Sequence, residues 1–236
     1  FYGDVGDFET AGKLVQAAVD HFGKIDILVN NAGTFRHAWP WEMTEADWDH
    51  VTGNKPKSAF NMIRHALPFM IEQKWGRIIN CTSGAWLGQK HHANYSAANA
   101  GVVGLTRSVA QDVYQYGITC NAYAPAAITR ATISMRILNY RRDKTGEPVT
   151  EESLAKAPAP EQLAPFVAYL ATEAALNISG TVFFVRGGHI DRYSDPEKIA
   201  SLEKQDGLWT VDELIDQVPD ALLAGYKALH QPGRRT

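Results

Sequence analysis

The 236-residue chain is poor in the features that would place it outside the ordinary globular class. It has two cysteines, Cys81 and Cys120, each inside an apolar segment. So few thiols exclude a disulfide framework and favour buried free thiols in a reducing, cytoplasmic compartment. The net charge of −3 shows no cationic excess that would attract nucleic acid or an anionic membrane, and no apolar run reaches bilayer-spanning length. We therefore expect no nucleic-acid partner and no membrane partner.

The sequence also lacks a pattern of metal ligands. His91 and His92 are adjacent, but no further ligand follows at the spacing that a zinc site needs. We therefore predict no metal and expect both histidines in a hydrated loop or at the rim of a substrate site. The tryptophans Trp39, Trp41 and Trp86 are candidates for that rim or for core packing, and the sequence leaves both open.

What the chain does contain is an alternation of strand-like and helix-like segments, which predicts an α/β fold with parallel βαβ units. Two capping-box patterns, TEAD from Thr44 and TVDE from Thr210, mark helix starts, and a charged, irregular segment at 131–160 suggests a lid over a site. The predicted strands are 25–29, 77–82, 118–123 and 181–185, and the predicted helices are 11–22, 58–73, 93–116, 161–174 and, in the tail, 218–229.

The segment ANYSAAN at 93–99 raises a chemical question. Tyr95 and Asn99 lie four residues apart, so on a helix they share one face. A phenol has an ordinary pKa of about 10, and a neighbouring cation would lower that pKa toward working pH. Asn99 carries no charge, so the positive charge that such a phenol needs must come from elsewhere.

Several short motifs together resemble the short-chain dehydrogenase/reductase family in their order and spacing. The motifs are Asp4 with Val5, NNAG ending at Gly33, the pair of Ser83 and Tyr95, NAYAP at 121–125 and VRGG at 185–188. The resemblance extends from the start of the chain to about Ile190. It implies a Rossmann-like doubly wound parallel sheet, NAD or NADP as cofactor, and hydride transfer between the nicotinamide and a secondary alcohol or ketone. It also implies a homodimer or homotetramer that assembles through the helices at 58–73 and 93–116.

The resemblance assigns roles to individual residues. Tyr95 would be the general acid or base, and Ser83 would hydrogen-bond the substrate oxygen. Thr82 is the second candidate for that role, because the spacing from Ser83 to Tyr95 is one residue shorter than usual. Ala126 stands where the family has glycine in the loop that holds the nicotinamide. The implied cofactor-binding residues are Asp4, Asn31, Ala32, Gly33, Pro125, Ile128 and Thr129.

The catalytic pattern departs from the family in a way that suggests an exchange. Asn99 replaces the lysine that follows the tyrosine. An ungapped alignment from Trp48 to Phe60 places Lys55 where the family has an asparagine, and a shift of one residue places Asn54 there. Our hypothesis is that the Lys55 ammonium takes over and biases Tyr95 through a water molecule. The alternative is that Lys55 simply reaches solvent beside a kink at Pro56.

A second departure concerns what the family has before Asp4. The first strands and helices of the family fold are lacking, and with them the glycine-rich turn for the pyrophosphate and the residue that chooses NAD or NADP. We therefore expect an incomplete gene product, an exposed apolar edge at 25–29 unless something covers it, and impaired activity. A non-catalytic structural or regulatory subunit is the alternative. Cofactor-free chemistry, as in the related halohydrin dehalogenases, ranks last because those carry arginine at the position of Asn99.

The tail is a separate feature. We expect a partial dehydrogenase domain at 1–190 and an extension at 191–236 that packs on it. The segment LWTVDEL at 208–214 resembles the extension of bacterial and peroxisomal 3-hydroxyacyl-CoA dehydrogenases of the same family.

Overall fold

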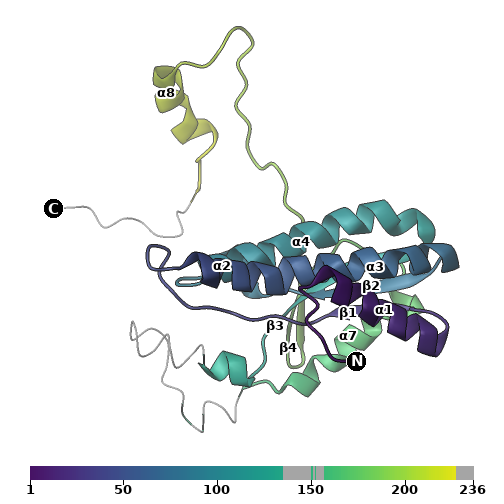
Figure 1. Ribbon diagram of the computed structural model, residues 1–236. Helices are drawn as coiled ribbons and strands as arrows, with labels where there is room; N and C mark the ends of the chain where they lie inside the picture. Colours follow the sequence, from purple (N-terminus) through teal and green to yellow (C-terminus); the bar gives the residue numbers. More distant parts are fainter. Residues whose placement is uncertain (135–149, 151, 153–156, 227–236) are drawn as a thin grey trace. The chain divides into compact units, whose positions relative to one another are not determined.

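The computed structural model describes residues 1–134, 150, 152 and 157–226 (Figure 1). Four parallel strands, β1 (Ile27–Asn30), β2 (Gly76–Cys81), β3 (Ile118–Pro125) and β4 (Val182–Arg186), lie side by side in chain order. A fifth strand, β5 (His189–Arg192), pairs antiparallel with β4. The predicted α/β class and parallel sheet are confirmed, whereas β5 is an element that the sequence analysis did not predict.

Helices cover the two faces of the sheet unequally. Helices α1 (Phe8–Phe22), α3 (Ser58–Gln73) and α4 (Ala93–Val113) lie on one face, and α7 (Ala164–Leu170) lies on the other (Figure 1). Side chains alternate along β2, because Ile78 belongs to the first core and Ile79 to the second. A polar ladder crosses the sheet, in which Asn30 donates to Asn80 Oδ1 at 2.8 Å and Asn80 donates to Thr106 Oγ1 at 2.9 Å.

β1 forms an outer edge of the described sheet. Its apolar side chains Ile27 and Val29 are 46% and 42% exposed, whereas every residue of β2 is buried. The exposed apolar edge expected from the sequence is therefore present in the described part of the chain.

The connection from α2 (Glu45–Thr52) to α3 is a π-helical turn, Gly53–Lys57. The predicted capping box starts α2, since Thr44 Oγ1 accepts from the Asp47 backbone amide at 3.1 Å. Pro56 has no N–H and cannot continue an α-helical ladder, so the chain widens there by one residue. The turn is single, and helical structure resumes at Ser58.

One predicted helix of the first 193 residues differs from the structure. The segment predicted as one helix at 161–174 is broken into two 3₁₀ turns, Pro160–Gln162 and Glu173–Ala175, around the short α7. Of the predicted lid at 131–160, residues 130–134 are helical, and most of the remainder lies outside the described residues.

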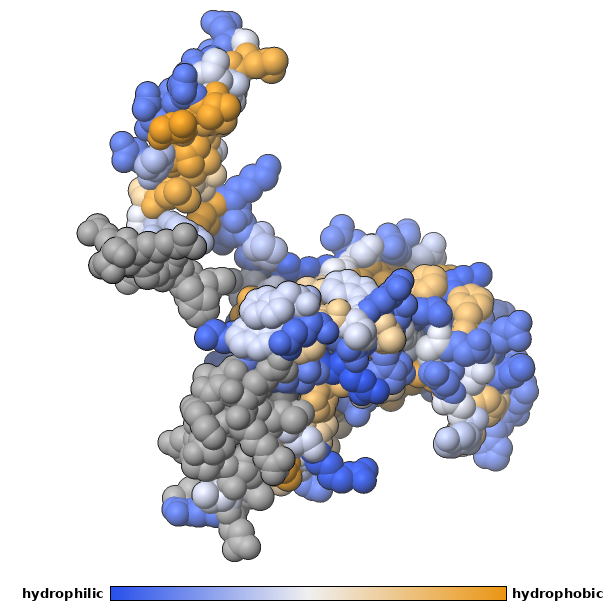
Figure 2. Space-filling model, turned by 60° about the vertical axis from the view of Figure 1, so that its left-hand side comes forward, coloured by the Kyte–Doolittle hydropathy of each residue, from blue (hydrophilic) through white to orange (hydrophobic). Residues whose placement is uncertain are grey.

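The chain divides into two compact units, 1–193 and 194–236. In the second unit, α8 (Val211–Ala221) follows directly after its capping box at Thr210, so the prediction of a helix starting at 218 was wrong in position. Lys204 donates to Glu213 at 2.7 Å and lowers the pKa of Glu213 to about 2. Apolar side chains gather on this unit (Figure 2), including the exposed Leu208, Val211 and Ile215. Among the described helices, none combines the length and apolar character needed to cross a bilayer.

Candidate active site

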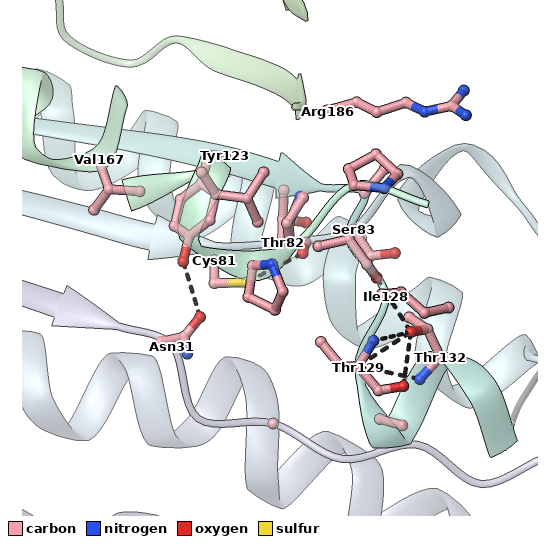
Figure 3. A pocket seen from close by; sticks show the side chains of 18 of the residues that line it. Asn31, Cys81, Thr82, Ser83, Tyr123, Ile128, Thr129, Thr132, Val167 and Arg186 are labelled. Carbon is pink, nitrogen blue, oxygen red and sulfur yellow. Dashed lines mark hydrogen bonds between the residues drawn. The ribbon is translucent and has the colours of Figure 1, made fainter. Parts of the chain in front are cut away.

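A cavity of about 1200 Å³ opens where the parallel strands end. Each strand contributes a residue at or just beyond its carboxyl end, namely Asn31 after β1, Ser83 after β2, Ala126 after β3 and Arg186 at the end of β4. This is the edge at which open parallel sheets bind their ligands. Figure 3 shows side chains from separate strands and from the α7 side converging on the same space.

Tyr95 and Ser83 meet in the wall of this cavity. Ser83 ends the extended segment after β2 and caps a 3₁₀ turn, where its Oγ accepts from the Ala85 backbone amide at 3.2 Å. Tyr95 enters from the first turn of α4. Burial raises the pKa of the Tyr95 phenol, and its interactions with the Ser83 and Asn99 side chains oppose that rise. No cationic side chain among the described residues lowers that pKa.

Thr82 also lines the cavity, but its hydroxyl is already engaged. Thr82 Oγ1 donates to the Asn99 backbone carbonyl at 3.0 Å and so ties the end of β2 to α4. The neighbouring Ser83 is the hydroxyl that interacts with Tyr95. This geometry favours Ser83 over Thr82 as the partner of the phenol.

Asn99 lies outside the cavity lining and is fully buried. Its Nδ2 donates to the Tyr95 backbone carbonyl at 2.8 Å, one turn back on α4. Its Oδ1 has no hydrogen-bond partner among the described residues. The amide is therefore held by its own helix.

Asn54 and Lys55 are neighbours inside the π-helical turn, but their side chains have different surroundings. Asn54 Nδ2 donates to the His50 carbonyl at 2.8 Å, whereas Lys55 is 5% exposed and lines the cavity. The Lys55 side chain crosses in front of Gly33, where an added Cβ would lie 3.0 Å from Lys55 Cδ and 3.1 Å from Nζ. Of the two alignments that the sequence left open, the ungapped one corresponds to the residue that reaches the cavity.

The predicted cofactor-binding residues fall into three groups. Asp4 is exposed and outside the lining; its Oδ1 accepts from the Gly6 amide at 2.8 Å, while Asp7 caps α1. Ala32 lines a smaller neighbouring cavity of about 210 Å³. The residues that line the large cavity are Asn31, Gly33, Pro125, Ile128 and Thr129.

The loop after β3 is held by its own hydrogen bonds. The Ile128 amide donates to the Pro158 carbonyl at 2.8 Å, and the Thr129 amide donates to Thr132 Oγ1 at 2.6 Å (Figure 3). These contacts fix one wall of the cavity beside Pro125.

The sequence analysis missed several lining residues, among them Tyr123, Cys81 and Arg186. Tyr123 OH donates to Asn31 Oδ1 at 2.8 Å, a bond that joins β3 to the loop after β1 (Figure 3), and burial raises the pKa of this phenol. Cys81 is at the end of β2, the strand that lies between β1 and β3. Arg186, at the end of β4, extends away from Tyr123 (Figure 3). Their positions at the carboxyl ends of predicted strands were the available signal.

The histidines near Tyr95 form a ring cluster. His37 Nδ1 lies 3.4 Å from His92 Nε2, and the His91 ring lies 3.8 Å from that of Trp39, edge to face. Burial lowers the pKa of His92. In the described part of the chain, no group of three or more His, Cys, Asp or Glu side chains is arranged to hold a metal ion.

Comparison with known proteins agrees with this geometry. The family profile described as Enoyl-(Acyl carrier protein) reductase matches residues 1–189. The chain belongs to the short-chain dehydrogenase/reductase family. A short-chain dehydrogenase from Mycobacterium avium superposes with a TM-score of 0.77 at 34% identity, over 93% of this chain and 72% of that one.

Two relatives are similar to this chain in sequence. The chain is 36% identical over 192 residues to the 3-oxoacyl-[acyl-carrier-protein] reductase FabG of Staphylococcus aureus, which covers 78% of this chain and 74% of that protein. It is 35% identical over 216 residues to the peroxisomal hydratase-dehydrogenase-epimerase of Neurospora crassa. That match covers 90% of this chain but only 23% of the fungal protein.

Proposed function

We propose that the protein is an NAD(P)-dependent oxidoreductase that transfers hydride between nicotinamide and a secondary alcohol or ketone. The observation that carries the proposal is the meeting of Tyr95 and Ser83 in one cavity at the carboxyl ends of the parallel strands. The bound cofactor supplies the hydride chemistry, and the protein orients it and stabilises charge. The missing side chain of Gly33 leaves the space that the Lys55 side chain fills, which places the lysine beside the proposed cofactor. The other cavity residues that would hold the cofactor are Asn31, Pro125, Ile128 and Thr129, with Ala32 and Asp4 supporting them.

The hydroxyl groups of Ser83 and Tyr95 have different roles in the proposed reaction. Ser83 donates a hydrogen bond to the substrate oxygen and holds it next to the phenol. Tyr95 gives its proton to that oxygen when a ketone is reduced and takes a proton when an alcohol is oxidised. Because burial raises the pKa of Tyr95, the phenol is protonated at neutral pH, which favours ketone reduction.

The cavity wall and the relatives support a proposal for the substrate class. The α7 side of the cavity is apolar, with Leu163, Val167 and Ala171 in the lining, and suits an acyl chain. The match to the fungal hydratase-dehydrogenase-epimerase covers 90% of the chain and so includes part of the tail beyond residue 193. We therefore place 3-oxoacyl and 3-hydroxyacyl thioesters first among substrates. We also propose a cytoplasmic homodimer or homotetramer that assembles through α3, where Phe60 is 47% exposed, and α4.

A non-catalytic relative is the second candidate, and one observation favours it. No cation among the described residues lowers the pKa of Tyr95, so the phenol is a weaker acid than the reaction prefers. Such a protein would keep the fold and the oligomer interface without turnover.

A fluorescence titration with NADH and NADPH, followed by turnover of acetoacetyl-CoA, separates the two candidates. The proposal predicts saturable binding of at least one nucleotide and its consumption in the presence of the thioester. Binding without turnover of this or any other ketone would support the non-catalytic relative. Absence of binding to either nucleotide would reject the oxidoreductase.

A further inference from the structure

Lys55 is a buried cation in the wall of the large cavity. Its side chain is 5% exposed, and its Nζ has no hydrogen-bond or ion-pair partner among the described residues. No carboxylate of the described residues lines the cavity, where Arg186 is the second cation. Burial of a charge is unfavourable unless a partner of opposite charge or suitable hydrogen bonds arrive. The missing partner is therefore expected to come with a ligand.

The surrounding structure holds this side chain in place. The π-helical turn packs on α4, since an added Cβ on Gly101 would lie 3.4 Å from Pro56 Cβ. On the cavity side, the Lys55 stem runs past Gly33, and the three atoms closest to an added Gly33 Cβ all belong to Lys55. A single π-turn inside a helix frequently occurs at a functional site. Lys55 is the buried residue of this turn, and it lines the cavity.

Groups other than Lys55 dominate the pKa of the Tyr95 phenol. The groups that influence Tyr95 are its buried surroundings and the side chains of Ser83, Cys81 and Asn99. Lys55 is absent from that set although both residues line the same cavity. The charge is therefore available to a ligand.

We infer that Lys55 is an anion-binding residue whose ammonium receives an anionic oxygen of the ligand, in the first place a phosphate oxygen of the nucleotide. The inference rests on the proposed function only for the identity of the natural ligand. It assigns to Lys55 a role in binding and not in setting the acidity of Tyr95.

The test compares Lys55→Met with Lys57→Met, which removes the same charge from an exposed position in the same turn. NADH affinity is measured by fluorescence, and binding of inorganic pyrophosphate is measured by the shift that it causes in the unfolding temperature. A lost hydrogen bond to a charged group predicts NADH binding about ten- to a hundredfold weaker in Lys55→Met. Wild type and Lys57→Met should bind alike, and pyrophosphate should stabilise both but not Lys55→Met.

A second variant keeps the charge and moves it. Gly33→Ala would place a methyl group 3.1 Å from Nζ and displace the Lys55 side chain, so pyrophosphate should stabilise this variant less than wild type. Equal NADH affinity and an equal pyrophosphate shift in Lys55→Met and wild type would overturn the inference. If neither NADH nor NADPH binds wild type, the proposed cofactor is wrong, and pyrophosphate alone decides. A pyrophosphate shift that depends on Lys55 supports the inference, whereas no shift in wild type, or a shift that does not depend on Lys55, overturns it.

Discussion

The π-helical turn Gly53–Lys57 packs against α4, and each of the two elements buries one polar side chain close to the cavity. The two side chains differ in whether the protein itself supplies a hydrogen-bond partner. On α4, Asn99 donates to the Tyr95 carbonyl of its own helix and does not face the cavity. On the π-turn, Lys55 is buried, faces the cavity and has no partner among the described residues. The Asn99 amide is anchored by its donor to its own helix and acts on the Tyr95 phenol, whereas the Lys55 ammonium has no partner in the described part of the chain and indicates a ligand.

The chemistry itself should depend on α4 more than on any other element. Tyr95→Phe removes the proton donor and should lower kcat by about 10²–10⁴-fold, because general acid catalysis contributes an effect of that size. Steady-state turnover of acetoacetyl-CoA gives the value, and Tyr114→Phe, at a 62% exposed position, is the control. A Tyr95→Phe protein with wild-type kcat would remove the phenol from the reaction.

A lysine at position 99 of α4 should give Tyr95 the neighbouring positive charge that it lacks in the wild type. In Asn99→Lys an ammonium stands four residues after Tyr95 and should lower the pKa of the phenol by about 1–3 units. Ketone reduction needs the protonated phenol, so its decline at high pH should move to lower pH, while alcohol oxidation at neutral pH should rise. The pH–rate profiles of both directions give the answer. Profiles that coincide with those of the wild type would show that the new ammonium does not reach the phenol.

Removing the cation from the π-turn should stabilise the unliganded protein. Lys55→Met replaces a buried, unpartnered charge with an apolar side chain of similar length, so the free energy of unfolding should rise by about 1–3 kcal/mol. Urea unfolding without nucleotide measures the change, with Lys57→Met as the exposed control. A purely structural lysine would give the opposite sign, namely a less stable Lys55→Met protein.

The smallest effect concerns the helix that leads into the π-turn. Thr44→Ala removes the N-cap of α2 and should cost about 1 kcal/mol of stability. Hydrogen exchange should localise the loss to α2 and the following turn. Unchanged exchange in these residues would mean that tertiary contacts, and not the cap, fix the start of this helix.

Local sequence signals predicted much of the framework. The apolar runs gave β2 and β3, and the body of α3 was predicted with the bounds that the structure shows. Both capping boxes are present, because a cap depends on residues only three apart. The exposed β1 edge was also predictable, because it follows from the order of the family's strands.

Other features depend on contacts that no local pattern encodes. β5 is exposed along its length and exists because it pairs with β4, so it has no apolar alternation to find. The bond from Tyr123 to Asn31 joins residues far apart in the sequence. The two alignments of Lys55 and Asn54 could not be separated from sequence, because both residues lie in the π-turn and only the folded structure brings Lys55 to the cavity while Asn54 bonds back to His50.

The pH dependence of kcat/KM for NADH in ketone reduction, compared between wild type and Lys55→Met, tests most directly whether Lys55 binds the ligand or sets the acidity of Tyr95. This quantity reports the ionisation of the free enzyme, the state that the structure describes. If Lys55 serves the ligand, kcat/KM falls through weaker binding while its decline at high pH stays at the same pH. A decline that moves to higher pH in Lys55→Met would show that the ammonium sets the acidity of Tyr95 and would contradict the account.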